Sequence, residues 1–108
     1  MDTALRTEKA AASTQGLTSL ARLGPGRQAM IKVVGRTLDG RADGMLERRL
    51  LEIGFEEGRE VEVRHVSPFG GDPIAVRVDR LNIALRRGEA AFVLVAPRPD
   101  EPVETPET

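Results

Sequence analysis

The chain has 108 residues, a length that suits one domain, with 40% hydrophobic and 31% charged residues and a formal net charge of −1. It contains no cysteine, which excludes disulfides and thiolate metal sites, and no tryptophan or tyrosine, so aliphatic side chains must fill the core. The longest apolar run, residues 90–96, is far shorter than the roughly 18 residues of a membrane-spanning helix, and no secretory signal is evident. These features favour a cytoplasmic protein that does not insert into a membrane.

The two ends of the chain differ in composition from its middle. Residues 1–16 are rich in alanine, threonine and serine without a periodic apolar pattern, and we expect a flexible tail there. Residues 97–108 are acidic and rich in proline, a composition that predicts a disordered tail. One domain is therefore expected over residues 17–96, where 13 basic residues accompany 11 acidic ones. This mixed charge argues against nucleic-acid binding, which needs basic residues concentrated on one face.

The first half of this domain is predicted to contain one strand and one helix. Three leucines precede a Gly-Pro-Gly turn at residues 24–26, and a β-branched run then predicts a strand over Gln28–Val34. Leu46, Leu50 and Ile53 follow at helical spacing and predict a helix over residues 43–53 with this stripe in the core.

Both ends of the predicted helix carry recognisable signals. Asp43 is placed to accept hydrogen bonds from the free amides of the first turn. Gly54 suits the left-handed residue that ends a helix, and Phe55 should then pack back against Leu50.

The second half is predicted to be β-structure. Val61, Val63 and His65 alternate with polar residues and indicate a strand over Glu60–Val66, with His65 on the core face. After a Gly/Pro loop at residues 67–73, two alternating runs around a short connection predict the hairpin of Ile74–Val78 and Leu81–Leu85. A helical turn at residues 86–90 precedes a last strand over residues 92–95. About five strands with one early helix indicate a mainly β protein, a small closed barrel.

Four segments of the domain carry a recognisable pattern in order: residues 17–26 (LTSLARLGPG), 50–58 (LLEIGFEEG), 68–74 (PFGGDPI) and 83–90 (IALRRGEA). Together they resemble the FeoA family of bacterial ferrous-iron uptake proteins. The resemblance implies a Src-homology-3-like β-barrel with an inserted helix over residues 17–96. It also implies a cytosolic partner of FeoB, a membrane transporter for ferrous iron with a GTP-binding domain.

Catalytic and metal-binding chemistry finds little support. The chain has one histidine and no glycine-rich phosphate loop, so we expect no enzyme and no cofactor. Ferrous iron prefers imidazole and carboxylate ligands, and His65 with Asp72 or Asp79 is the only combination available. Nothing in their spacing argues that these side chains converge, and no metal site is expected.

A docking surface is the remaining candidate site. Arginine pairs can engage acidic groups of a partner, although solvated faces paired with neighbouring glutamates are the simplest alternative. Phe69 on its Gly/Pro loop either covers a barrel mouth or anchors a partner, and Leu51 lies off the helix stripe. The candidate residues are Arg48, Arg49, Leu51, Pro68, Phe69, Pro73, Arg86, Arg87 and Glu89.

The functional hypothesis is therefore a binding module. It would dock on a FeoB-type transporter, peripheral to the inner membrane, and modulate its assembly or activity. The alternative is a peptide-binding or self-assembling small β-barrel unrelated to iron, with a homo-oligomer as one outcome.

Overall fold

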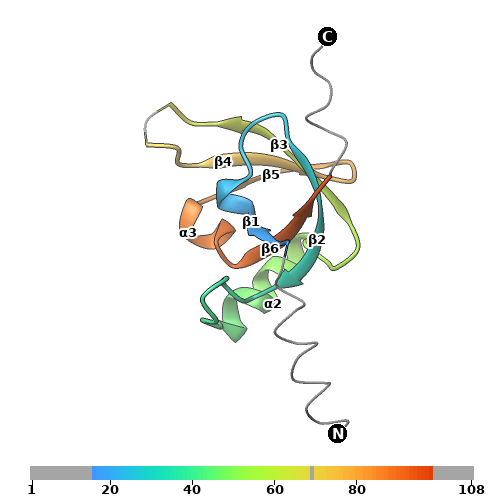
Figure 1. Ribbon diagram of the computed structural model, residues 1–108, viewed down its shortest axis with the longest axis vertical. Coiled ribbons are helices and arrows are strands. Elements are labelled where there is room, and N and C mark those ends of the chain that lie inside the picture. Colours follow the sequence, from blue (N-terminus) through green and yellow to red (C-terminus); the bar gives the residue numbers. More distant parts are fainter. Residues whose placement is uncertain (1–15, 69, 99–108) are drawn as a thin grey trace, which may run out of the picture.

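The computed structural model describes residues 16–68 and 70–98, which form a six-stranded antiparallel sheet with helix α2 at one end (Figure 1). The elements are β1 (Thr18–Ser19), the 3-10 helix η1 (Leu20–Arg22), β2 (Gln28–Val34), α2 (Gly44–Ile53), β3 (Glu60–Val66), β4 (Ile74–Val78), β5 (Leu81–Leu85), α3 (Arg87–Ala90) and β6 (Val93–Pro97). Strands β2 to β5 have the bounds that the sequence predicted, whereas β6 begins one residue and ends two residues later than expected. Arg98 continues the pairing of β6 with β2, since the amide of Arg98 donates to the carbonyl of Gln28 over 3.0 Å. The predicted tails otherwise lie outside the described residues.

The strands follow the order β1-β6-β2-β3-β4-β5 across the sheet. The sheet curls around its core (Figure 1), but within residues 16–68 and 70–98 no pairing joins β1 to β5. The expectation of a closed barrel was therefore wrong. β1 is only two residues long and pairs with β6 alone, which leaves β1 and β5 as the two edges of the sheet. So short a strand cannot be recognised from the sequence, because two residues show no alternation.

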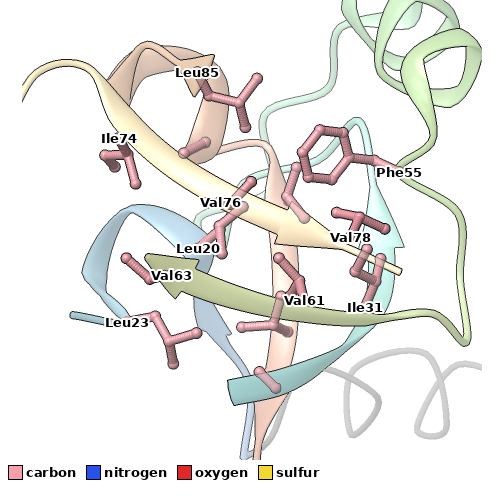
Figure 2. Close-up of a cluster of buried hydrophobic side chains, with 14 of the residues drawn as sticks. Leu20, Leu23, Ile31, Phe55, Val61, Val63, Ile74, Val76, Val78 and Leu85 are labelled. Atoms are coloured by element: carbon pink, nitrogen blue, oxygen red, sulfur yellow. The ribbon is translucent and has the colours of Figure 1, made fainter. Parts of the chain in front are cut away.

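The core is made almost entirely of aliphatic side chains, as the composition required. Figure 2 shows the cluster, in which valines of β3 and β4 meet Leu20 of η1 and the ring of Phe55. Phe55 enters from the end of α2 and is completely buried. The helix is thereby attached to the sheet by a residue just beyond its own last turn.

Helix α2 begins and ends as its sequence predicted. The side chain of Asp43 accepts the amide of Leu46 over 3.0 Å, which confirms the N-cap. Gly54 is left-handed, with φ of 118°, and the amide of Phe55 donates to the carbonyl of Leu50 over 2.9 Å. These bonds confirm the expected glycine stop.

Ile53, in contrast, is not part of the core. Leu50 is buried and Leu46 is half-buried against the core, but Ile53 is 38% exposed. The predicted stripe was therefore wrong at Ile53, in the last turn of α2. The fully buried residue at this end of the helix is Phe55, which follows the cap residue Gly54.

The Asp43 cap provides a test of local stability. Replacing Asp43 with alanine should lower the free energy of unfolding by about 1 kcal/mol, because the amide of Leu46 loses its acceptor. Urea denaturation followed by circular dichroism measures this loss. Asp43→Asn keeps an acceptor at the same place and should retain most of the stability; an equal loss in both variants would contradict the capping role.

His65 points away from the core, which corrects the sequence prediction. Val63 pairs with Val76 and His65 pairs with Ala75, so β3 uses two residues where β4 uses one. The bulge at Arg64 shifts the alternation of β3 by one residue, and His65 is exposed.

Candidate partner-docking site

The loop between β3 and β4 is joined to α3 by its acidic residue. Asp72 Oδ1 accepts the backbone amide of Arg87 over 3.0 Å. A Cβ atom placed on Gly71 would lie 3.1 Å from Arg87 Nη1, so the Arg87 side chain rests against the loop backbone. Within the loop, the amide of Gly71 donates to the carbonyl of Ser67 over 3.0 Å. The loop thereby holds Arg87 at its base.

Glu89 joins α3 to α2. Its Oε1 atom accepts the backbone amide of Arg86 over 3.0 Å, and its Oε2 atom lies 3.8 Å from Arg49 Nη1. The first contact caps the N-terminus of α3, and the second places the guanidinium of Arg49, from α2, beside α3. Because Arg49 is largely exposed, this ion pair contributes little to stability and leaves the guanidinium accessible to a partner.

Five of the nine predicted residues therefore gather around α3. We call them, with Asp72, the α3 cluster: Arg49, Asp72, Pro73, Arg86, Arg87 and Glu89. Asp72, Pro73 and Arg86 line an open hollow of about 230 Å³ beside it. Three arginines against two carboxylates leave the cluster with an excess of positive charge. It is suited to contact an acidic group on another molecule.

Arg48 and Leu51 lie apart from this cluster. At 100° per residue, Arg49 and Leu51 project from opposite flanks of α2, and Arg48 projects away from buried Leu50. Arg48 lines a separate open hollow with Met45 near the start of the helix. Leu51 is 40% exposed, as the sequence predicted for a residue off the stripe.

The remaining predicted residues belong to the β3–β4 loop. Pro68 is exposed, and Phe69 lies outside the described residues. Asp72, which links the loop to α3, was not among the predicted docking residues. Its position before a proline is a common turn signal and gave no hint of its partner on α3.

The carboxylates that sequence analysis paired with His65 have other partners. Asp72 accepts the amide of Arg87, and Asp79 forms an ion pair with Arg59. The pKa of Arg59 is raised, chiefly by its hydrogen bond to Glu56 and then by the charges of Glu56 and Asp79. In the part of the chain that the structure describes, no group of three or more histidine, aspartate or glutamate residues could hold a metal ion. No helix in that part is long and apolar enough to cross a membrane.

Comparison with known families decides the identity of this domain. Residues 18–97, from β1 through the last residue of β6, match the FeoA domain. The chain belongs to the FeoA domain family. The four segments that suggested this family thus lie within or at the edge of the matched region, and the resemblance is confirmed.

One curated relative carries a FeoA domain and a transporter in a single chain. It is the Fe(2+) transport protein A/Fe(2+) transporter FeoB fusion protein of Porphyromonas gingivalis, 36% identical over 77 residues. The match covers 70% of this chain and 8% of the fusion protein. The FeoA domain is thereby linked to ferrous-iron transport. The matched region spans only a small part of the fusion protein.

Solved FeoA structures share the fold. FeoA of Stenotrophomonas maltophilia, solved with zinc and described as a procaryotic SH3 domain protein, is 36% identical with a TM-score of 0.61 over 72% of this chain and 88% of that one. Iron(II) transport protein A of Clostridium thermocellum is also 36% identical, with a TM-score of 0.64 over 74% of this chain and 45% of that one. The expected fold, mainly β and Src-homology-3-like with an inserted helix, is confirmed.

Proposed function

We propose that this FeoA domain is a cytoplasmic accessory module of ferrous-iron uptake that docks on a FeoB-type membrane transporter and modulates its assembly or activity. The fusion protein of P. gingivalis is the observation that carries the proposal. A covalent link keeps two domains at a high effective concentration. Where the two are separate chains, a docking surface has to supply the same proximity.

The α3 cluster is the surface best suited to this docking. It combines arginines from α2 and α3 with the base of the β3–β4 loop, and the contacts of Asp72 and Glu89 hold these parts in one arrangement. A preformed surface loses little conformational entropy when a partner binds. Pro68 would extend this surface along the loop, whereas a partner would have to reach around α2 to contact Arg48 and Leu51.

The effect on transport would follow from binding alone. A module without catalytic chemistry changes a transporter only by binding one of its conformations more tightly than another. Binding measured with and without GTP therefore shows whether the nucleotide state selects that conformation. The domain would reach the membrane through this partner.

Charge reversal in the α3 cluster tests the proposal. Arg86→Glu should weaken binding to the full-length FeoB-type transporter, purified in detergent from the same organism, by about tenfold. Lys32→Glu is the matched control, because Lys32 is an exposed cation on β2, three strands from β5 in the sheet order. It should bind as the unmodified protein does.

Two results would count against the proposal. If the folded protein binds the transporter in no nucleotide state, the docking function is wrong. If both charge reversals weaken binding equally, the attraction depends on the overall charge and the α3 cluster is not the docking surface.

A further inference from the structure

Strand β5 is an edge of the sheet without the usual protection. It pairs with β4 along all five residues in an unbroken register, and no described strand pairs with its other side. Its sequence, Leu-Asn-Ile-Ala-Leu, has no charge, proline or glycine. Natural sheets block their edges with such residues, with bulges or with very short strands. The opposite edge, β1, is protected by its length of two residues, whereas β5 remains open to pairing.

The backbone groups that β5 offers follow from its hairpin. A connection of two residues, Asp79 and Arg80, joins Val78 to Leu81, and such a loop closes on a hydrogen-bonded pair. Alternation then directs the amides and carbonyls of Asn82 and Ala84 away from β4. Both residues are exposed, and no turn, loop or side chain among the described residues bonds to these groups. They form two donors and two acceptors in the spacing that an added strand requires.

Apolar surface borders the start of this edge. Leu81 is 51% exposed and Ile53, in the last turn of α2, is 38% exposed. A Cβ atom placed on Gly54 would lie 3.3 Å from Leu81 Cδ1, so the end of α2 lies against the first residue of β5. An added strand would therefore find apolar contacts for its side chains as well as backbone partners.

The charges at the two ends of β5 indicate which charges an added strand should carry. Arg80 precedes the strand and Arg86 follows it, and both are exposed. Antiparallel pairing of two copies about Ile83 would place Arg80 of one copy opposite Arg86 of the other, and like charges directly opposite are destabilising. A segment with acidic residues at its ends would instead meet an arginine at each end.

We propose that the β5 edge takes up an extended, apolar segment with acidic ends, contributed by the transporter as a seventh strand of the sheet. This inference rests on the proposed function, because it assigns the segment to the docking partner named there. Arg86 belongs both to the α3 cluster and to the end of β5, so the two contacts form one continuous surface. Main-chain pairing supplies affinity and the flanking charges supply register.

Hydrogen exchange on the complete chain tests the edge directly. On addition of the full-length transporter in detergent, the amide protons of Asn82 and Ala84 should exchange at least about tenfold more slowly, because each gains an acceptor. The amides of Leu81 and Ile83 face β4 and should change much less. NMR or mass spectrometry with residue-level fragmentation resolves the two sets.

A proline variant provides the second test. Ala84→Pro removes an outward backbone donor and keeps every hydrogen bond to β4, and edge strands tolerate proline at such positions. The variant should weaken binding to the transporter at least about tenfold. Ala84→Val retains the amide and should bind as the unmodified protein does. If Ala84→Pro does not fold, by circular dichroism, the exchange measurement on the unmodified protein decides.

The outcomes separate this inference from the proposed function. Binding that leaves Asn82 and Ala84 unprotected would overturn the β5 assignment and leave transporter docking intact. Absence of any binding would overturn both. Light scattering could show that the unmodified protein is a dimer and that Ala84→Pro is a monomer. This result would assign the β5 edge to a second copy of the chain, and the proposal of a strand from the transporter would be wrong.

Discussion

Replacing Gly35 with alanine should lower the free energy of unfolding by about 3 kcal/mol, because two costs add at this residue. Gly35 has φ of 94°, in the left-handed region that disfavours side chains. A Cβ atom there would also lie 2.5 Å from the Cβ atom of Glu47, which is too close for either atom. The clash falls on the rigid part of the Glu47 side chain and cannot be relieved by rotating it.

The surroundings of Gly35 restrict its backbone as well. Its amide donates to the carbonyl of Phe92 over 2.7 Å, and its carbonyl accepts the amide of Asp43 over 3.1 Å. The residue therefore joins the end of β2 both to the start of β6 and to the N-terminus of α2. A movement of the backbone that relieved the clash would lengthen one of these bonds.

Gly40→Ala is the matched control for this prediction. Gly40 has φ of 91°, but a Cβ atom placed there would have no neighbour within 4 Å. This variant should cost only the backbone strain, about 1 kcal/mol. Urea unfolding of both variants measures the difference, and equal losses would mean that α2 shifts to make room at Gly35.

Phe55→Ala should lower the free energy of unfolding by about 3 to 5 kcal/mol. The ring is completely buried among β-strand side chains, and it attaches α2 to the sheet (Figure 2). Its removal leaves a cavity and also weakens the contact between helix and sheet. For a domain of this size such a loss shifts the melting temperature by more than about 10 °C, which calorimetry resolves readily.

Leu81→Ala serves as the comparison for the loss of an apolar side chain at the surface. Leu81 is 51% exposed, so its removal should change stability by less than about 1 kcal/mol. A loss at Phe55 as small as this would mean that the neighbouring side chains close the cavity without penalty. The role of Phe55 in fixing α2 would then be wrong.

The proposed docking surface and the stability of the domain should depend on different residues. Arg86, Arg87 and Ala84 are exposed, and changes there should affect binding more than folding. Gly35 and Phe55 should do the reverse. Binding assays on the surface variants can therefore be interpreted without correction for unfolding, provided that circular dichroism confirms the fold.

The local sequence predicted the strands and the helix ends well, because the determinants are local. Alternation of apolar residues and flanking turn residues indicated β2 to β5 with their observed bounds. Asp43 and Gly54 marked the ends of α2 because capping depends on residues within one helical turn.

The errors share a different physical origin. His65 is exposed because a bulge in the pairing of β3 with β4 shifts the alternation, and pairing register is not visible within one strand. Ile53 is exposed, and the buried residue at the end of α2 is Phe55, which lies beyond the helix and therefore outside the apolar stripe. Strand β1 and the open sheet result from pairing between the two ends of the domain.

The sequence by itself determined the FeoA family, through four short segments, together with the mainly β fold, both bounds of four strands and the caps of the helix. Each strand, cap and segment is recognised from residues close together in the chain. The tertiary structure decided which predicted docking residues meet. It brought Arg49 of α2 to Glu89 and Asp72 to Arg87, and it left the amides of Asn82 and Ala84 at an open edge. These placements depend on the order of strands in the sheet and on packing between segments distant in the chain, which no local pattern of residues specifies.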